Sequence, residues 1–437
     1  MSYSSAVAEL NRMTPELYTQ PGAVRRKFSL DEIRILLEAL GNPQKKFRSI
    51  LIAGTNGKGS TAATLASILD ACGLRTALYT SPHLERPNER IRINGREISD
   101  DAFANRYFQV HDAAQKLVLG GRLAQMPSFF ETLTAMAFLH FAEEAVAVAV
   151  LEVGMGGRLD ATNIVDPMLS IITDISLDHT EWLGPTIAAI AREKAGILRP
   201  GGTLVTLPQH PEANQAIGEV AVELNVRGLS AASYMPLLGA GESYPVKVLG
   251  EEIEVASPLH GPHQQRNIAL AIAAAVELGQ NHGLPMTAQA IAAGIRATSW
   301  PGRLEKLRSG AHTWILDVAH NPSGAWALRA SLREMAPAPQ VLVFSCLRDK
   351  PLTELAQILF PLFDAVILAP VSSPRATPPA DLLAAAAGTG TPAYAAESVA
   401  EALALARQHA GNAPVVVSGS VYLVGEARSL LFAQDMQ

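Results

Sequence analysis

The stretch RSILIAGTNGKGSTAATLASILDACG (48–73) decides how the first part of the chain folds. Its apolar start, RSILIAG (48–54), ends at a glycine, and STAATLASILDACG (60–73) has helical periodicity that stops at Gly73. RTALYTS (75–81) is strand-like again. The pattern predicts a strand, a loop, a helix and a second strand.

The loop IAGTNGKGST (52–61) is similar to a phosphate-binding loop with altered spacing, because only two residues separate Gly54 from Gly57. Glycines between a buried strand and a helix N-terminus let backbone N–H groups approach an anion, and the helix dipole favours negative charge there. The loop is therefore a candidate nucleotide site, although a glycine-rich turn would show the same spacing.

Polar residues at the end of this loop fit a nucleotide. Lys58 would place a positive charge near the β- and γ-phosphates, and Ser60 or Thr61 would offer a hydroxyl to Mg²⁺. Gly59 separates Lys58 from Ser60, so the loop does not match a generic NTPase motif.

Length and composition predict an ordinary globular protein of two domains. The chain has 437 residues, more than the roughly 300 at which single cores stop growing. Hydrophobic residues make up 48% and charged residues 17%, and the net charge is −6. A chain without a basic face is a poor match for a nucleic-acid phosphate backbone, so no nucleic-acid partner is expected.

The cysteines and the apolar segments favour a cytoplasmic protein. Cys72 and Cys346 are too few for a disulfide framework. The start, MSYSSAVAEL, lacks the pattern of a signal peptide, and the longest apolar runs, such as AVAVAVL (145–151), are far shorter than the ~20 residues that span a bilayer. Neither secretion nor membrane insertion is expected.

Strand-like and helix-like segments alternate beyond the loop, which predicts a doubly wound, mostly parallel sheet in a domain covering residues 1–296. Residues 225–257 alternate over short pieces and are predicted to form a small antiparallel appendage. The predicted elements are a helix at 129–144, strands at 146–154 and 168–176, a helix at 186–198, a strand at 202–207, and helices at 265–279 and 287–296.

A Pro-Gly interruption in ATSWPGRLEKL (297–307) indicates a domain boundary. Beyond it, apolar strands alternate with alanine-rich helices, so residues 297–437 are predicted to form a smaller, Rossmann-like α/β domain. Its strands are expected at 313–319, taken as the first strand of this domain, and at 340–346, 364–370 and 414–420.

Polar residues after the predicted strands are candidates for metal binding. Glu152 and His179 follow strands whose carboxyl ends lie at the edge of the sheet that carries the phosphate loop, where α/β proteins bind ligands. With Ser60 they could hold Mg²⁺, although capping of loops explains Glu152 and His179 equally well. Lys194, in a helical pattern, is by itself a typical solvated lysine.

Two further groups are candidates for contacts with substrate or nucleotide. Asp317 and His320 follow a strand of the second domain and precede a turn, so they fit either a ligand contact or a simple Asx turn. In GPHQQRN (261–267), His263 and Asn267 are better suited to hydrogen-bond a base or phosphate than to bind a metal.

Taken together, these motifs resemble the bacterial folylpolyglutamate synthase/dihydrofolate synthase family of the Mur ligase superfamily. The match covers most of the chain, in order. It rests on GTNGKGS (54–60), SPHL (81–84), ERIRING (89–95), SFFE (128–131), LEVGMGGRLDATN (151–163), SLDHTEWLG (176–184), REKAGI (192–197), GPHQQRN (261–267), PGR (301–303) and DVAHNP (317–322).

The resemblance implies an ATP-dependent amide ligase, with ATP bound by the first domain and closed over by the second. It assigns catalytic roles to Lys58, Lys194 and His320 and predicts carbamylation of Lys194. It implies nucleotide contacts from Gly54, Thr55, Asn56, Gly57, Lys58, Gly59, Ser60, Asn267, Arg303 and Asp317. It places Mg²⁺, expected as two ions, on Ser60, Glu152, His179 and Lys194, and adds a monovalent cation.

The implied substrates are ATP, L-glutamate, dihydropteroate and reduced folates, acted on by a monomer. Substrate contacts are expected from Pro82, His83, Ser128, Phe130, Asp160, His320 and Ser418. A folate polyglutamylase without dihydrofolate synthase activity remains an alternative. Another Mur-type amino-acid ligase is less favoured, since only about 50 residues precede the loop. A P-loop kinase or nucleotide-binding switch has no need for the remaining motifs.

Overall fold

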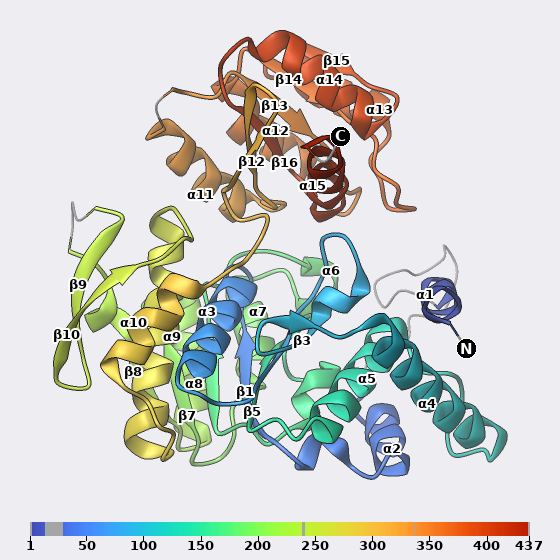
Figure 1. Cartoon of the computed structure of the whole chain (residues 1–437), viewed down its shortest axis with the longest axis vertical. Coiled ribbons are helices and arrows are strands. Elements are labelled where there is room, and N and C mark those ends of the chain that lie inside the picture. The colour runs from blue at the N-terminus through green and yellow to red at the C-terminus, as the bar shows by residue number, and fades with distance from the viewer. Residues whose placement is uncertain (1, 14–28, 238–240, 336, 436–437) are drawn as a thin grey trace. The chain divides into compact units, whose positions relative to one another are not determined.

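The computed structural model describes residues 2–13, 29–237, 241–335 and 337–435, and the chain divides into two compact units (Figure 1). Unit 1 consists of Met1–Pro82, Pro87–Pro258 and Gln265–Thr298. Unit 2 consists of His83–Arg86, Leu259–Gln264 and Ser299–Gln437. Two short segments from the first part of the chain therefore belong to unit 2.

Unit 1 is built on an eight-stranded sheet in the order β4-β3-β2-β5-β1-β6-β7-β8. In this order the neighbouring strands from β2 to β8 pair parallel, whereas β3 pairs antiparallel with both of its neighbours, β2 and β4. The predicted doubly wound, mostly parallel sheet is confirmed. The strands are β1 (Arg48–Ala53), β2 (Thr76–Tyr79), β3 (Ile91–Ile93), β4 (Arg96–Glu97), β5 (Val148–Glu152), β6 (Leu169–Ile172), β7 (Thr203–Thr206) and β8 (Arg227–Ser230).

Helices cover both faces of this sheet, as parallel strands require (Figure 1). The α-helices are α1 (Tyr3–Arg12), α2 (Asp31–Ala39), α3 (Lys58–Ala71), α4 (Asp100–Leu119), α5 (Phe129–Glu143), α6 (Thr180–Leu183), α7 (Ile187–Ala195), α8 (Pro211–Glu223), α9 (Pro262–Asn281) and α10 (Ala288–Ala297). The 3-10 helices are η1 (Pro43–Lys45), η2 (Pro87–Arg90), η3 (Ala161–Ile164) and η4 (Ala231–Tyr234).

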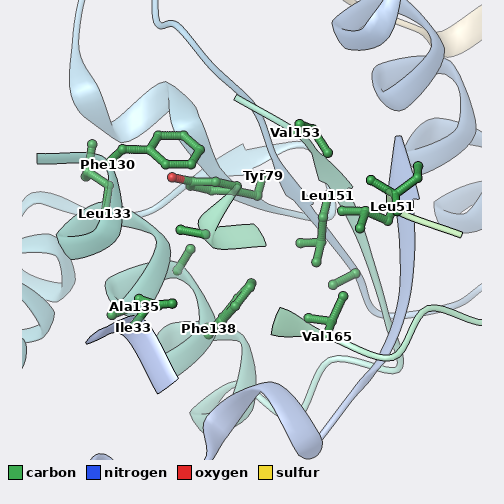
Figure 2. Close-up of a cluster of buried hydrophobic side chains, with 14 of the residues drawn as sticks. Ile33, Leu51, Tyr79, Phe130, Leu133, Ala135, Phe138, Leu151, Val153 and Val165 are labelled. Atoms are coloured by element: carbon green, nitrogen blue, oxygen red, sulfur yellow. The ribbon is translucent and has the colours of Figure 1, made fainter. Parts of the chain in front are cut away.

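The core explains why the central strands are apolar throughout. On one face of the sheet, Leu51 and Leu151 pack with Tyr79 and with Phe138 of α5 (Figure 2). The alternate residues of β1 are equally buried on the opposite face, where α3 lies against the sheet. In α3, Ile68 is so close to Gly294 of α10 that a Cβ on the glycine would lie 2.4 Å from the Ile68 Cα. This close packing fixes the helix that begins at the phosphate loop.

Residues 225–257 differ in part from the prediction. The antiparallel pair is present as β9 (Ser243–Val248) and β10 (Glu251–Ala256). Residues 227–230, however, form β8, which pairs parallel with β7 at the edge of the main sheet. A four-residue strand with exposed side chains carries too weak a pattern to be recognised as a sheet strand. Residues 238–240 lie outside the described residues.

Unit 2 is a smaller α/β unit with a six-stranded sheet in the order β11-β12-β16-β13-β14-β15. The antiparallel pair β11–β12 lies at one edge, and the other strands pair parallel. Its strands are β11 (Glu305–Ser309), β12 (His312–Leu316), β13 (Val341–Phe344), β14 (Ala365–Leu368), β15 (Ala393–Ala395) and β16 (Val415–Ser418). Its helices are α11 (Pro322–Arg333), α12 (Leu352–Leu359), η5 (Phe360–Leu362), α13 (Pro379–Ala387), α14 (Val399–Ala410) and α15 (Val421–Asp435).

The predicted first strand of this unit, at 313–319, is its second strand. β11 precedes it as an edge strand with a charged, alternating sequence, EKLRS, which an apolar run does not reveal. In the described part of the chain, no helix has the length and apolarity needed to cross a membrane.

Candidate active site

The phosphate loop of unit 1 joins β1 to α3, and two of its glycines cannot be replaced without collision. Gly54 has a φ of +154°, and a Cβ there would lie 1.8 Å from the Thr173 Oγ1. Gly57 has a φ of +87°, and a Cβ there would lie 2.1 Å from the Asn267 Oδ1. Only glycine, which has no Cβ, can adopt these φ angles while its neighbours lie so close.

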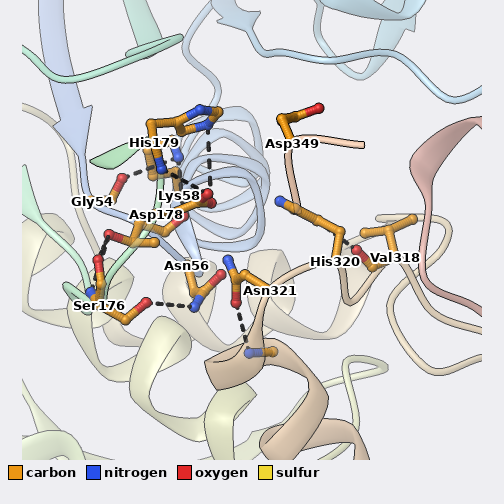
Figure 3. Close-up of polar contacts among 12 residues, drawn as sticks. Gly54, Asn56, Lys58, Ser176, Asp178, His179, Val318, His320, Asn321 and Asp349 are labelled. Atoms are coloured by element: carbon orange, nitrogen blue, oxygen red, sulfur yellow. Dashed lines mark hydrogen bonds and ion pairs between the residues drawn. The ribbon is translucent and has the colours of Figure 1, made fainter. Parts of the chain in front are cut away.

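The segment after β6 holds the loop in place. The N–H groups of Thr55 and Asn56 donate to the carbonyl of Asp174 over 2.9 and 3.2 Å, and the Thr173 hydroxyl donates to the Asn56 carbonyl over 2.7 Å. The Asn56 side chain also donates to the Ser176 hydroxyl over 3.4 Å (Figure 3). These bonds organise the loop without using the amides at the start of α3.

Helix α9 is fastened to the same segment. Arg266 donates two hydrogen bonds to the Asp174 carboxylate, over 2.8 and 2.6 Å, in a bidentate ion pair. Its neighbour Asn267 is 5% exposed and lies over Gly57. The predicted nucleotide contact Asn267 is therefore next to the phosphate loop.

The N-terminus of α3 is suited to an anion. Gly57 occupies the N-cap position with no side-chain cap, so the first-turn amides are left for a ligand. Ser60 and Thr61 lie in this first turn and are buried. In the described part of the chain the Thr61 hydroxyl has no hydrogen-bond partner.

Two lysines meet at the loop. The Lys58 Nζ donates to the carbonyls of Gly54 and Thr55 over 3.1 and 3.2 Å, and the Lys194 Nζ donates to the same Gly54 oxygen over 2.7 Å. Burial, and then the positive charge of Lys58, lower the pKa of Lys194 to about 7. The pattern-based expectation of a solvated Lys194 is wrong, since α7 presents this side chain to the loop and it is 5% exposed.

Glu152 ends β5, which pairs with β1 on one side and β2 on the other. Its carboxylate is buried, and Oε2 accepts a hydrogen bond from the Ser81 N–H over 3.1 Å. Ser81 follows β2, so the ends of two neighbouring strands meet here. A carboxylate at this edge of the sheet could bind a cation beside the phosphate loop.

His179 follows β6, the other neighbour of β1. It has left-handed backbone, with a φ of +50°, and its N–H donates to the Asp178 Oδ1 over 2.9 Å. Its Nε2 lies 3.9 Å from the Asp178 Oδ2 (Figure 3). The Asp178 charge also acts on Lys194, raising its pKa against the larger effects of burial and Lys58.

The donor set fits Mg²⁺ bound together with a nucleotide. Within the described ranges, no three His, Cys, Asp or Glu side chains form a group that could hold a metal ion by themselves. Nucleotide-bound Mg²⁺ usually takes one or two carboxylates, with phosphate oxygens and water completing its octahedron. Glu152 supplies such a carboxylate, and the hydroxyl of Ser60 lies in the first turn of α3.

Three predicted substrate residues of unit 1 have structural partners. Ser128 caps α5 in a capping box with Glu131, over 3.2 and 2.8 Å. The Asp160 carboxylate accepts hydrogen bonds from the Met155 and Thr162 N–H groups over 2.9 and 3.0 Å, and its burial raises its pKa.

The third, Phe130, is 6% exposed, and its ring centroid lies 6.0 Å from that of Tyr79 (Figure 2). A Cβ on Gly154 would lie 2.6 Å from the Phe130 ring. The ring is part of the core, so stacking on a flat ligand would require it to turn outward.

In unit 2, Asp317 is a buried anchor after β12. Its two oxygens accept hydrogen bonds from the N–H groups of Leu304 and Ala319 over 3.0 and 2.9 Å. Burial raises its pKa, against the opposing charges of His263 and Arg303. Predicted nucleotide contacts Arg303 and Asp317 are therefore brought close together, with His263 near them.

His320 lies after β12, and Ser418 is the last residue of the neighbouring strand β16. The His320 Nδ1 is 2.8 Å from the Val318 carbonyl (Figure 3), and the Ser418 hydroxyl donates to the Ala319 carbonyl over 3.5 Å. The two residues thus contact one stretch of backbone, 318–319. Of the other predicted substrate residues, Pro82 belongs to unit 1 and His83 to unit 2.

Sequence reasoning missed several residues that shape the site. Thr173 and Asp174 hold the loop, Asp178 acts on Lys194, and Ser81 contacts Glu152. All of them follow strands of the sheet, so the strand-end argument applied to Glu152 could have found them.

Two family descriptions match the chain. Residues 52–275 match the Mur ligase middle domain, and residues 302–421 match the Mur ligase glutamate ligase domain. The folylpolyglutamate synthase of Lacticaseibacillus casei is 36% identical over 442 residues, which cover 99% of both chains. The chain belongs to the folylpolyglutamate synthase/dihydrofolate synthase family of Mur ligases. It is therefore an enzyme of the ligase class.

Other members of the family are similar over nearly the whole chain. The Escherichia coli dihydrofolate synthase/folylpolyglutamate synthase is 32% identical over 93% of this chain and 92% of its own. The structure of E. coli FolC in complex with DHPP and ADP matches with a TM-score of 0.86, at 30% identity, over 100% of this chain and 99% of that one. The Mycobacterium tuberculosis folylpolyglutamate synthase with ADP and AMPPCP matches with a TM-score of 0.85, at 36% identity, over 92% and 95%.

Proposed function

We propose that this ligase uses ATP to join L-glutamate to the carboxylate of dihydropteroate, giving dihydrofolate, and to reduced folates, giving polyglutamates. The observation that carries the proposal is the meeting of Lys58 and Lys194 at the Gly54 carbonyl, at the N-terminus of an uncapped helix. The names of the relatives, and the ADP and DHPP of the E. coli structure, agree with it.

The reaction needs an activated acid, because a carboxylate is a poor acylating agent. A carboxylate oxygen would attack the γ-phosphorus of ATP, forming an acyl phosphate and releasing ADP. The glutamate amine would then attack the acyl carbon and displace phosphate. The protein has to align these groups and exclude water from the acyl phosphate.

In this proposal the residues of unit 1 hold the triphosphate. The amides at the start of α3 bind phosphate oxygens, and the Lys58 ammonium turns from the loop carbonyls to the β- and γ-phosphates. Asn267, over Gly57, contacts the nucleotide. Glu152, His179 and Ser60 would hold Mg²⁺, which when bound would supply neutralising charge for the transferred phosphoryl group.

Lys194 is proposed to act as an anion. An amine with a pKa of about 7 is partly neutral at neutral pH, and a neutral amine can add to CO₂ and lose a proton to give a carbamate. Such a carbamate would stand beside Lys58 and the phosphate loop, where it could serve as a further Mg²⁺ ligand.

The residues of unit 2 are proposed to complete the substrate contacts. Arg303 and Asp317 contribute to nucleotide binding, while His320, after β12, and Ser418, at the end of the neighbouring strand β16, bind the incoming glutamate. The acid substrate is assigned to Pro82, His83, Ser128, Phe130 and Asp160. These assignments divide the work between an ATP-binding domain, residues 1–296, and a ligase domain, residues 297–437.

The test offers dihydropteroate and a reduced folate separately, each with ATP, Mg²⁺ and glutamate, and measures ADP and the extended product. We expect glutamate-dependent ADP release with both acids and none with a muramyl-peptide precursor. Extension of the folate alone would identify a polyglutamylase, and ADP release with the muramyl precursor would identify a cell-wall ligase. No ADP release with any pterin would overturn the proposal.

A further inference from the structure

Residues 83–86, here called the strap, belong to unit 2, although the chain on both sides of them belongs to unit 1. On one side, the Ser81 N–H donates to the Glu152 carboxylate over 3.1 Å. On the other, the buried Asn88 donates to the Ile98 carbonyl over 2.8 Å. The strap is therefore a four-residue segment of unit 2, and hydrogen bonds within unit 1 hold the chain on both sides of it.

The backbone of the strap is seated on helix α15. A Cβ on Gly425 would lie 2.0 Å from the Leu84 carbonyl oxygen and 2.7 Å from its carbon. The Leu84 side chain packs on the core of unit 2, and its methyl carbons would lie 3.3 and 3.4 Å from a Cβ on Gly302. The missing side chain of Gly425 thus leaves the space in which the strap backbone packs against α15.

A polar clamp holds the next residue. The two carboxylate oxygens of Glu85 accept hydrogen bonds from the Arg428 Nη1 over 2.6 Å and from the Ser429 hydroxyl over 2.8 Å. Arg428 in turn donates from Nε to both oxygens of Glu305 over 3.1 Å, and Glu305 accepts from the Gly302 N–H over 2.9 Å. Both acceptor atoms of Glu85 are therefore engaged by α15.

We propose that α15, through Gly425 and the Glu85 clamp, fixes the acid-substrate loop that runs from Ser81 into the strap. Gly425 and Glu85 are then positioning residues: they need not contact substrate, and they act by holding Ser81 beside Glu152 and Pro82–His83 in place. This inference rests on the proposed function, which assigns Pro82 and His83 to the acid substrate. It makes binding of that substrate depend on a helix more than 300 residues away in the sequence.

Gly425→Ala is the sharpest test, because alanine favours a helix over glycine while its Cβ would expel the Leu84 carbonyl. We expect the KM for the pterin acid to rise about tenfold with the KM for ATP within about twofold. The matched control is Gly218→Ala in α8, where nothing lies within 4 Å of an added Cβ. The control should keep the kinetics of the parent enzyme.

The clamp gives a second, independent variant. Glu85→Ala removes both acceptors and should raise the same KM, whereas Glu85→Gln keeps one amide oxygen as acceptor and should recover part of the loss. Hydrogen exchange of the peptide covering residues 80–88 gives a readout independent of turnover. Exchange there should be about tenfold faster in Gly425→Ala and Glu85→Ala, with the core strands of unit 2 unchanged.

The outcomes separate the inference from the proposed function. If the parent enzyme extends no pterin but hydrogen exchange at residues 80–88 is faster in the variants, α15 still positions the strap and the proposed function is overturned. If the enzyme is active and the variants change neither the hydrogen exchange nor the KM for the pterin acid, the inference that α15 positions the strap is overturned. A loss shared by Gly218→Ala, or a fall in kcat with both KM values unchanged, would also count against it.

Discussion

Lys58 and Lys194 donate hydrogen bonds to one carbonyl oxygen, that of Gly54, over 3.1 and 2.7 Å. Two cationic side chains on one acceptor are costly in a buried site, and the pKa of Lys194 falls to about 7, from burial first and from Lys58 second. Converting Lys194 to a carbamate would turn this repulsion into attraction. The Lys58–Lys194 pair therefore gives a physical reason for the proposed carbamate on Lys194.

Replacing Lys194 by alanine should reduce glutamate-dependent ADP release at least about a hundredfold, roughly 3 kcal/mol of transition-state stabilisation. Added acetate or formate should restore part of the activity by supplying the missing anion in the space left by the side chain. Lys194→Arg, which keeps a charge but cannot form a carbamate, should stay inactive without rescue. Normal turnover in the unrescued alanine variant would show that Lys194 has no such role.

Glu152→Gln should lower turnover by about a thousandfold, because loss of the charge withdraws several kcal/mol of stabilisation from the metal-assisted step. The amide oxygen can still accept the hydrogen bond from the Ser81 N–H, so the fold should be kept. Glu219→Gln, at an exposed carboxylate paired with Arg192, is the control and should behave as the parent. Steady-state ADP release and a thermal melt on all three proteins decide the matter, and near-normal rates for Glu152→Gln would contradict the metal role.

Some of the site could be predicted from the sequence because its signals are local. The strand, glycine loop and helix at 48–73 form one continuous pattern, and Glu152 ends an apolar strand. The burial of Lys194 could not be predicted in this way, since its partner, the Gly54 carbonyl, is 140 residues away in the sequence. Helical periodicity reports which face of a helix is apolar, not which lysine a distant loop will accept.

The membership of two early segments in unit 2 could not be predicted from the sequence for a similar reason. Residues 83–86 and 259–264 carry no composition shift, and they join unit 2 through contacts such as Leu84 with Gly425 and Gly261 with Ser331. β8 was missed because an edge strand of four residues needs no apolar face. Long-range contacts of this kind leave no periodic trace in a single sequence.

The buried His140 in α5 should make folding stability depend on pH. Its pKa is lowered from 6.5 to about 4, mainly by burial, with the charge of Glu144 opposing the shift and those of Arg106 and Arg75 adding to it. Between pH 6.5 and 4 the unfolded chain therefore binds a proton that the folded chain does not, so this contribution to stability is complete above pH 6.5 and is lost as the pH falls toward 4.

His140→Leu should remove that dependence. Urea unfolding at pH 7 and pH 5 should show the parent losing on the order of 1 kcal/mol more than the variant over this interval. The comparison uses the change with pH in each protein, so a shift in the variant's overall stability does not affect it. An equal pH dependence in both proteins would mean that His140 titrates normally in the folded state.

Gly57→Ala should strongly weaken nucleotide binding, whereas Gly73→Ala should not. Both glycines have left-handed backbone, with φ of +87° and +79°, so alanine strains each by about 1 kcal/mol. They differ in their surroundings: a Cβ at Gly57 would lie 2.1 Å from the Asn267 Oδ1, while nothing lies within 4 Å of one at Gly73. Calorimetric titration with ADP should show affinity reduced at least about a hundredfold for Gly57→Ala and within about threefold of the parent for Gly73→Ala. If both variants lose the same ADP affinity, backbone strain explains the effect. If Gly57→Ala still binds ADP tightly, the loop and Asn267 do not form the nucleotide site.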